Sequence, residues 1–159
     1  MLFRSWEFDG VQPVPRGIVG GTCPRARLSA RLLVALAARV APPCEAFGPD
    51  LKVIARGRVR YPDAMVECGR DDGDVATPAV VFEVLSPTTE RTDRGTEAQD
   101  HMAESCVLAI VLLAQDRPEA TVLRRPAAWR PEVARGPEAV IALPEVGLDL
   151  PLAAIYPAV

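Results

Sequence analysis

The chain has 159 residues, of which 49% are hydrophobic and 25% are charged. This length and balance predict one globular domain over residues 1–159 and argue against intrinsic disorder. The net charge of −3, from 18 basic and 21 acidic residues, argues against a generally basic nucleic-acid-binding surface but is compatible with a local basic cleft.

The cysteines and the leading residues bear on compartment. None of the 4 cysteines has a CxxC partner and only 1 histidine is present, which argues against a structural zinc site. The start of the chain carries charges where a signal peptide would have an apolar core. The longest uncharged apolar run, 106–114, is far shorter than the ~20 residues that span a bilayer. We therefore expect a cytoplasmic protein without a membrane segment and with reduced thiols.

The N-terminal segment predicts a β-hairpin followed by a loop. Strands at 6–8 and 11–14 would flank Asp9-Gly10, which supplies the positive φ of a tight turn. Residues 17–22 are rich in glycine, but they lack the preceding strand and the following Lys-Ser/Thr of a phosphate-binding loop. We expect a plain loop there.

Residues 24–40 predict an amphipathic helix, because leucine or valine recurs every four residues from Leu28 to Val40. The proline pair Pro42-Pro43 would end it. Three arginines lie off the apolar stripe, and they suit either phosphate contact or a solvated helix face: Arg27, Arg31 and Arg39.

The remainder predicts short strands around one further helix. Runs rich in β-branched or aromatic residues predict strands at 44–47, 51–54, 60–68 and 79–85. A polar helix over about 92–104 would be followed by a buried strand at 106–114 and an edge strand at 120–125. The strand–helix–strand order over 79–114 predicts a βαβ unit inside a mixed sheet, an α/β fold, with short segments after 126 closing the sheet.

Two carboxylates stand in or beside predicted strands. Glu83 interrupts an apolar strand, and Asp63 lies in a β-like run twenty residues earlier. Two carboxylates from adjacent strands offer hard oxygen ligands for Mg²⁺ or Mn²⁺. The alternative is structural: Asp63 caps a bend, and Glu83 pairs with an arginine such as Arg58 or Arg60.

The segments around these acids resemble a known family. Tyr61-Pro62-Asp63, the stretch from Val81 to Arg91 and Asp93-Arg94-Gly95 resemble the Uma-type restriction endonuclease family of the PD-(D/E)xK nuclease superfamily. The resemblance extends to the N-terminal hairpin, to residues 44–52 and to the closing segment around 143–156. It therefore covers most of the chain.

The resemblance implies a restriction-endonuclease-like mixed sheet flanked by helices and a Mg²⁺- or Mn²⁺-dependent active site. Asp63 and Glu83 match the metal-binding acids, and the backbone carbonyl of Val84 would complete the protein ligands. Three further residues match positions near such a site, with lower weight for the last two: Glu7, Asp50 and Ser86.

The sequence departs from the family where its catalytic lysine is expected. That position is Glu97, which could act as a general base or as a further cation ligand. An expected tyrosine is His101, either a base near the site or an ordinary helix residue, and an expected histidine falls near Arg25. Lys52, the only lysine, could substitute from a neighbouring strand or be a solvated surface residue.

The sequence thus favours a Mg²⁺-dependent DNA endonuclease whose catalytic residues are Asp63, Glu83 and Glu97. Candidate phosphate contacts are Arg27, Arg31, Arg91 and Arg94. The alternative is a catalytically silent nuclease fold that binds nucleic acid or a protein partner. A third reading is a structural oligomer module that uses the apolar strand 106–114, and a homodimer is compatible with all three.

Overall fold

The computed structural model describes residues 5–8, 13–16, 22–69, 72–87, 93–156 and 158. Its centre is a six-stranded sheet in the order β11-β10-β9-β8-β6-β3. Only β8 and β9 run parallel, and the other neighbours are antiparallel. The strands of this sheet are β3 (Cys44–Phe47), β6 (Ala64–Cys68), β8 (Val80–Leu85), β9 (Ala109–Ala114), β10 (Glu119–Arg124) and β11 (Pro131–Arg135).

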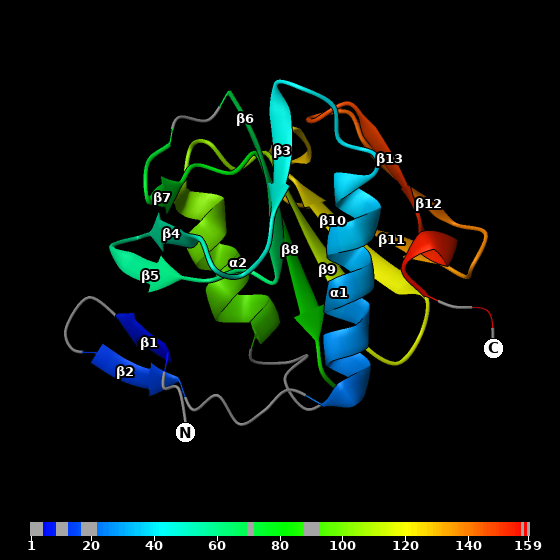
Figure 1. Cartoon of the computed structure of the whole chain (residues 1–159), viewed down its shortest axis with the longest axis horizontal. Coiled ribbons are helices and arrows are strands. Elements are labelled where there is room, and N and C mark those ends of the chain that lie inside the picture. The colour runs from blue at the N-terminus through cyan, green and yellow to red at the C-terminus, as the bar shows by residue number, and fades with distance from the viewer. Residues whose placement is uncertain are drawn as a thin grey trace.

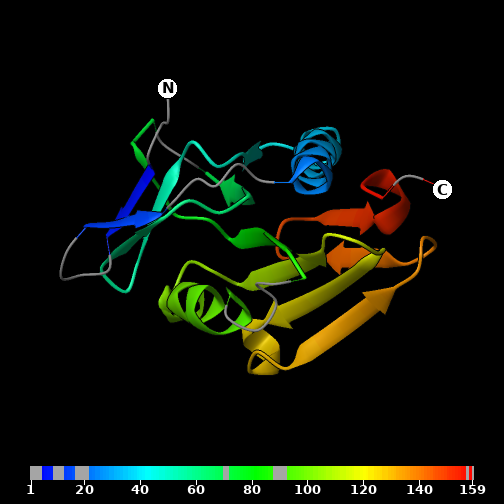
Figure 2. The same cartoon turned by 90° about the horizontal axis from the view of Figure 1, so that it is seen from below.

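One helix covers each face of the sheet, as Figure 2 shows. Helix α1 (Cys23–Ala37) buries Leu28, Leu32 and Leu36 against one face of β6, β8 and β9. Helix α2 (Asp93–Ala103) packs Ala98 against the opposite face, where the odd-numbered residues of β8 point. The βαβ unit β8–α2–β9 is confirmed. The predicted helix 24–40 is confirmed as an element, but it ends at Ala37, several residues before Pro42-Pro43.

Three smaller sheets surround the central one (Figure 1). The N-terminal hairpin consists of β1 (Ser5–Phe8) and β2 (Pro13–Arg16). A three-stranded sheet has the order β5-β4-β7, from β4 (Lys52–Ala55), β5 (Arg58–Arg60) and β7 (Val75–Ala76). A second hairpin, β12 (Val140–Leu143) with β13 (Leu148–Pro151), packs on the α1 side, and the single turns η1 (Arg125–Ala127) and η2 (Leu152–Ala154) complete the elements.

Several sequence expectations need correction. In the N-terminal hairpin Phe8 pairs with Pro13, and the part of the predicted second strand before Pro13 lies outside the described residues. The turn residues 9–12 and the loop 17–21 lie outside the described residues. The expected strand 60–68 is two strands in different sheets, because Pro62 has no N–H for a ladder and the chain bends at Asp63. The strand expected at the edge, 120–125, is interior, because β10 lies between β9 and β11. The final hairpin β12–β13 forms its own sheet and does not extend the central one.

The link between β4 and β5 was absent from the sequence prediction. Arg56 and Gly57 both have positive φ, 51° and 74°, and Ala55 pairs with Arg58 across them. This is a two-residue hairpin turn of the type whose twist suits antiparallel strands. Gly57 is the only sequence signal for it.

The strand 106–114 is not available to an oligomer partner. Its ordered part, β9, lies between β8 and β10, and all six of its residues are buried. Side chains buried within the subunit on both faces cannot form an interface, so the reading as an oligomer module built on this strand is wrong. A homodimer through some other surface stays a prediction.

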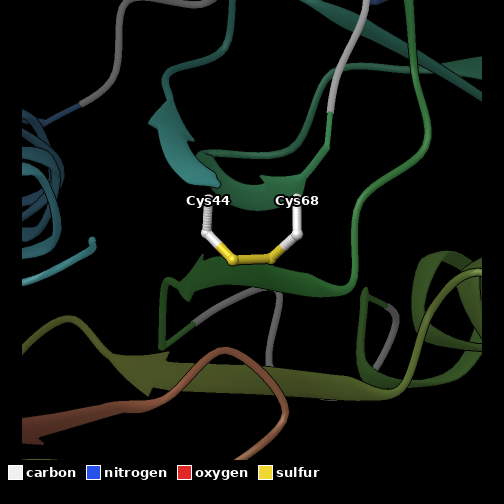
Figure 3. Close-up of a disulfide and its surroundings, with 2 residues drawn as sticks. All are labelled: Cys44 and Cys68. Atoms are coloured by element: carbon white, nitrogen blue, oxygen red, sulfur yellow. A yellow bond between two sulfur atoms is a disulfide. The ribbon is translucent and has the colours of Figure 1, made fainter. Parts of the chain in front are cut away.

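The expectation of reduced thiols is wrong for one cysteine pair. Cys44 on β3 and Cys68 on β6 face each other in the antiparallel register and form a disulfide (Figure 3). Cys23 and Cys106 are free. The two partners are 24 positions apart in the sequence, so only strand pairing reveals their proximity. A cytoplasmic location stays a prediction. Among the described residues, no helix has the length and apolar character to cross a membrane.

Candidate active site

Asp63 and Glu83 lie at the same level of the central sheet. Asp63 immediately precedes β6, and Ala64 pairs with Phe82 of β8. Continuing this antiparallel register by one position sets Asp63 opposite Glu83. The two predicted acids therefore come from adjacent backbone segments, as the resemblance implied.

The Asp63 carboxylate is held from two sides. The Val84 N–H donates to Oδ2 at 2.7 Å. Asp63 precedes β6, so its side chain takes the place of a backbone carbonyl as the acceptor for this N–H. Arg25, from the first turn of α1, places Nη2 at 2.9 Å from Oδ2 and 3.1 Å from Oδ1. Asp63 thus caps the bend, as the structural alternative supposed, and its charge is balanced by a guanidinium.

Val84 presents its backbone to the same edge as Asp63. In a strand, the N–H and the C=O of one residue point toward the same neighbouring strand. Since the Val84 N–H reaches Asp63, the Val84 carbonyl also faces the β6 side of β8. The structure therefore brings together two of the three predicted ligands, Asp63 and Val84.

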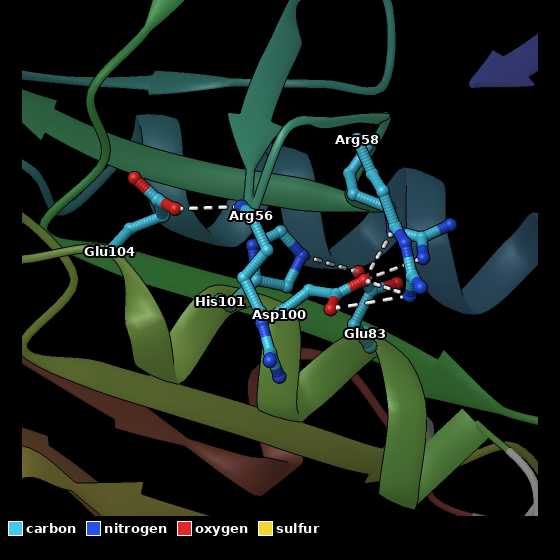
Figure 4. Close-up of polar contacts among 7 residues, drawn as sticks. Arg56, Arg58, Glu83, Asp100, His101 and Glu104 are labelled. Carbon is cyan, nitrogen blue, oxygen red and sulfur yellow. Dashed lines mark hydrogen bonds and ion pairs between the residues drawn. The ribbon is translucent and has the colours of Figure 1, made fainter. Parts of the chain in front are cut away.

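Glu83 lies on the face of β8 that α2 covers. Its strand neighbours Val81 and Leu85 belong to the α2-side core, and alternation puts Glu83 on the same face. It is 9% exposed, and His101 Nε2 of α2 lies 3.7 Å from its Oε1 (Figure 4). The contacts described for Asp63 and for Glu83 thus run to different helices.

His101 is fully buried, and neither ring nitrogen has a hydrogen-bond partner among the described residues. Burial lowers the pKa of His101 from 6.5 to about 4, although the nearby Glu97 carboxylate opposes that shift. At neutral pH the imidazole is therefore uncharged, and the 3.7 Å contact with Glu83 is not an ion pair. Glu97 itself is half-buried, one turn before His101 on α2.

A buried acid on α2 holds the neighbouring hairpin. Asp100 is 2% exposed and accepts from Arg60 Nη2 at 2.6 Å and from Arg58 Nη1 at 3.2 Å (Figure 4). One turn later, Glu104 accepts from the Arg56 backbone N–H at 2.8 Å. These contacts fix the β4–β5 hairpin against α2. The sequence signal for these contacts is the spacing of Glu97, Asp100 and Glu104. Intervals of three and four residues put all three acids on one side of the helix.

The other predicted residues lie as follows. Lys52 is half-buried on β4, Asp50 is exposed in the turn before it, and Ser86 directly follows β8. Glu7 lies on β1 opposite Val14. Arg91 and the side chain of Arg94 lie outside the description, while Arg27 and Arg31 are exposed on α1.

The oxygen atoms of Asp63, Glu83 and Val84 suit a hard cation, but the Arg25 guanidinium competes for Asp63. Two carboxylates and a backbone carbonyl are the oxygen ligands that Mg²⁺ and Mn²⁺ prefer. However, the described part of the chain contains no group of three or more metal-ligating side chains, and the Arg25 guanidinium contacts both oxygens of Asp63. A cation at Asp63 must therefore share or displace that guanidinium.

A mixed sheet with one helix on each face, and acids where two central strands adjoin, defines an α/β protein of the restriction-endonuclease-like class. The crystal structure of a putative nuclease belonging to DUF820 from Anabaena variabilis ATCC 29413 matches it with a TM-score of 0.74 and 17% identity. The match covers 96% of this chain and 89% of that one, and at this identity it shows a shared fold. Comparison with curated proteins finds no match.

The family follows from the sequence itself. The model of the Uma2 family, described as "putative restriction endonuclease", matches residues 19–153. This span is most of the chain, so the chain belongs to the Uma2 family. It includes both acids, Val84 and Glu97.

Proposed function

We propose that the protein is a Mg²⁺-dependent DNA endonuclease. Its active site, which hydrolyses phosphodiester bonds, contains Asp63 and Glu83. The observation that carries this proposal is the junction of β6 and β8, where Asp63 accepts from the Val84 N–H in register with Glu83. Membership of a family described as "putative restriction endonuclease" supports it.

In this proposal Asp63, Glu83 and the Val84 carbonyl would hold the cation. When bound, Mg²⁺ would polarise the scissile phosphate and lower the pKa of a bound water. The Val84 N–H keeps the Asp63 carboxylate on the edge of β8. Arg25 supplies a donor that can move from the carboxylate to a phosphate oxygen, since guanidinium binds both groups.

Glu97 acts as a proton acceptor, a weaker contribution than the charge stabilisation that a lysine at this position would give. It lies on the helix face that carries His101, which is itself in contact with Glu83. A carboxylate cannot stabilise negative charge on the attacked phosphate, but it can take a proton from water. The imidazole of His101 is buried beneath this helix face and neutral, so it does not add positive charge to the site.

The alternative function is a catalytically silent nuclease fold that binds nucleic acid or a protein partner. Two observations favour it. Arg25 already neutralises Asp63, and the position of the family's lysine holds Glu97. A bound guanidinium in place of a metal is a stable arrangement for a fold that no longer cuts.

Plasmid nicking with Mg²⁺ or Mn²⁺ separates the two functions. The natural protein is compared with Asp63→Ala, Glu97→Lys and the combination of both changes. Because an added ammonium can stabilise charge on the attacked phosphate, Glu97→Lys should cut about 10²–10³-fold faster than the natural protein. Glu138→Lys is the control with the same charge change, because Glu138 is exposed and distant in sequence from Glu97.

Each result has a clear meaning. Cleavage that needs Asp63 supports the endonuclease. If the natural protein cuts well and Glu97→Lys is slower, Glu97 is a working catalytic group. If neither the natural protein nor Glu97→Lys cuts, the endonuclease proposal fails in favour of the silent fold.

A further inference from the structure

A pocket of about 260 Å³ lies beside the start of α1. It is lined by residues of the first turns of α1, by the turn that follows β9 and by Tyr156 just after η2. Leu85 and Ala114 pair in the parallel register of β8 and β9, so Val84 and the pocket residue Gln115 lie at the same end of the sheet. None of the residues assigned to the metal site lines this pocket.

The mouth of the pocket carries unneutralised positive charge. Arg27 and Arg31 are exposed, and they lie one turn apart on the same face of α1. Neither makes a hydrogen bond or an ion pair with any described residue. Arg117 also lines the pocket, but Asp116 and Glu119 accept from it at 2.9 Å and 3.1 Å. Two guanidiniums are therefore available to an anion.

Apart from the arginines, the lining is mostly apolar, and its polar groups are the Gln115 amide and the Asp116 carboxylate, which pairs with Arg117. Leu28 and the Tyr156 ring provide its walls, and the Tyr156 hydroxyl already donates to the Ala114 carbonyl at 2.6 Å. The side-chain oxygen of Gln115 is buried without a hydrogen-bond partner among the described residues. A buried acceptor without a donor costs about 1–3 kcal/mol, so a ligand N–H that meets this oxygen once the Gln115 amide rotates into the pocket would be bound with selectivity.

An apolar interior, an amide inside and two cations at the mouth match the parts of a nucleotide. We propose that this pocket binds one unpaired nucleoside monophosphate unit, with its base inside and its phosphate on Arg27 and Arg31. The base edge donates to Gln115, and the ring contacts Leu28 and Tyr156. The volume is just below the usual range of small-ligand pockets, about 300–1,000 Å³, so it suits a base and sugar with the phosphate outside.

The same chemistry can come from a free mononucleotide or from an unpaired nucleotide in a DNA strand. Since Arg25 points to Asp63 while Arg27 lines the pocket, one strand could contact both sites across the start of α1. This second source rests on the proposed endonuclease function, whereas binding of a free nucleotide does not.

Binding is measured by calorimetry with thymidine 5′-monophosphate in EDTA, so the result is independent of metal and of cleavage. The Arg27→Gln, Arg31→Gln double variant should bind about 10–100-fold more weakly, as expected for the loss of charged hydrogen bonds. Gln115→Leu keeps the backbone bond to Leu85 and should also bind more weakly. The charge-matched control, Arg39→Gln with Arg130→Gln, removes two exposed arginines that do not line the pocket and should bind like the natural protein.

Ribose 5-phosphate tests whether the base matters, and a gapped duplex is compared with a fully paired one to test the strand. Preference for the nucleotide over ribose 5-phosphate, lost in Gln115→Leu, supports the pocket. Preference for the gapped duplex, lost in the double arginine variant, identifies the strand as the source, and equal binding of the two duplexes identifies the free nucleotide. Equal affinity for ribose 5-phosphate, or unchanged nucleotide affinity in the double variant, would overturn the proposal even if the protein cuts DNA. Melting temperatures of all variants verify that they are folded.

Discussion

Replacing Arg25 by glutamine should strengthen Mn²⁺ binding at Asp63. In the structure one guanidinium nitrogen lies 2.9 Å and 3.1 Å from the two carboxylate oxygens, and the side chains are 29% and 15% exposed. A hydrogen bond to a charged group contributes about 1.5–3 kcal/mol net, and this partial exposure places the pair at the lower end. If a metal must displace a contact of about 1.5 kcal/mol, its removal raises the affinity about tenfold.

The assay is a titration of free Mn²⁺ by electron paramagnetic resonance at fixed protein concentration. Arg39→Gln is the matched control, because Arg39 is exposed in the turn directly after α1 and its side chain donates to the backbone oxygen of Ala35. Combining Arg25→Gln with Asp63→Asn should remove the gain. The Val84 N–H still holds the carboxylate in Arg25→Gln, so the single variant should remain folded.

Two results would refute this reasoning. An unchanged or weaker Mn²⁺ affinity in Arg25→Gln would mean that the guanidinium does not compete with the cation. A gain that persists with Asp63→Asn would place the metal elsewhere. Either outcome would leave the pair of Arg25 and Asp63 as a structural clamp between α1 and β6.

Three further changes test the support around the site. Asp100→Ala leaves buried arginine charge without its acid and should cost about 3–5 kcal/mol of unfolding free energy in urea, while Asp116→Ala, at a 51% exposed side chain, should change it by under about 0.5 kcal/mol. The folded-state pKa of His101, about 4, is below the ordinary 6.5. Between these pH values the unfolded chain therefore binds more protons than the folded protein. The unfolding free energy should fall by about 3 kcal/mol as pH drops from 6.5 to 4. His101→Leu should lack that part of the pH dependence, and an identical pH profile in both proteins would contradict the assignment. Reduction with dithiothreitol should lower the unfolding free energy by about 3 kcal/mol, because the Cys44–Cys68 bond closes a loop of sequence separation 24, and the reagent should have no effect on the Cys44→Ser, Cys68→Ser variant.

The sequence by itself determined the elements whose signal is local. The four-residue recurrence from Leu28 to Leu36 predicted α1, and the apolar run of β8 predicted a strand buried on both faces. The motif around Asp63 and Glu83 identified the family, and the register of β6 and β8 then set those two positions side by side.

Tertiary structure decided which side chains meet. Arg25 reaches Asp63 across 38 positions, Asp100 binds Arg58 and Arg60 across about 40, and the disulfide joins two strands of one register. Such contacts depend on strand order and on which face each helix covers, and no local propensity encodes either. Glu83 therefore faces α2 while the Asp63 carboxylate is held by α1, and the pocket beside α1 forms only because the turn after β9 and the end of the chain return to the same place. Local pattern specifies the elements, and the long-range packing that brings distant charges together specifies the site.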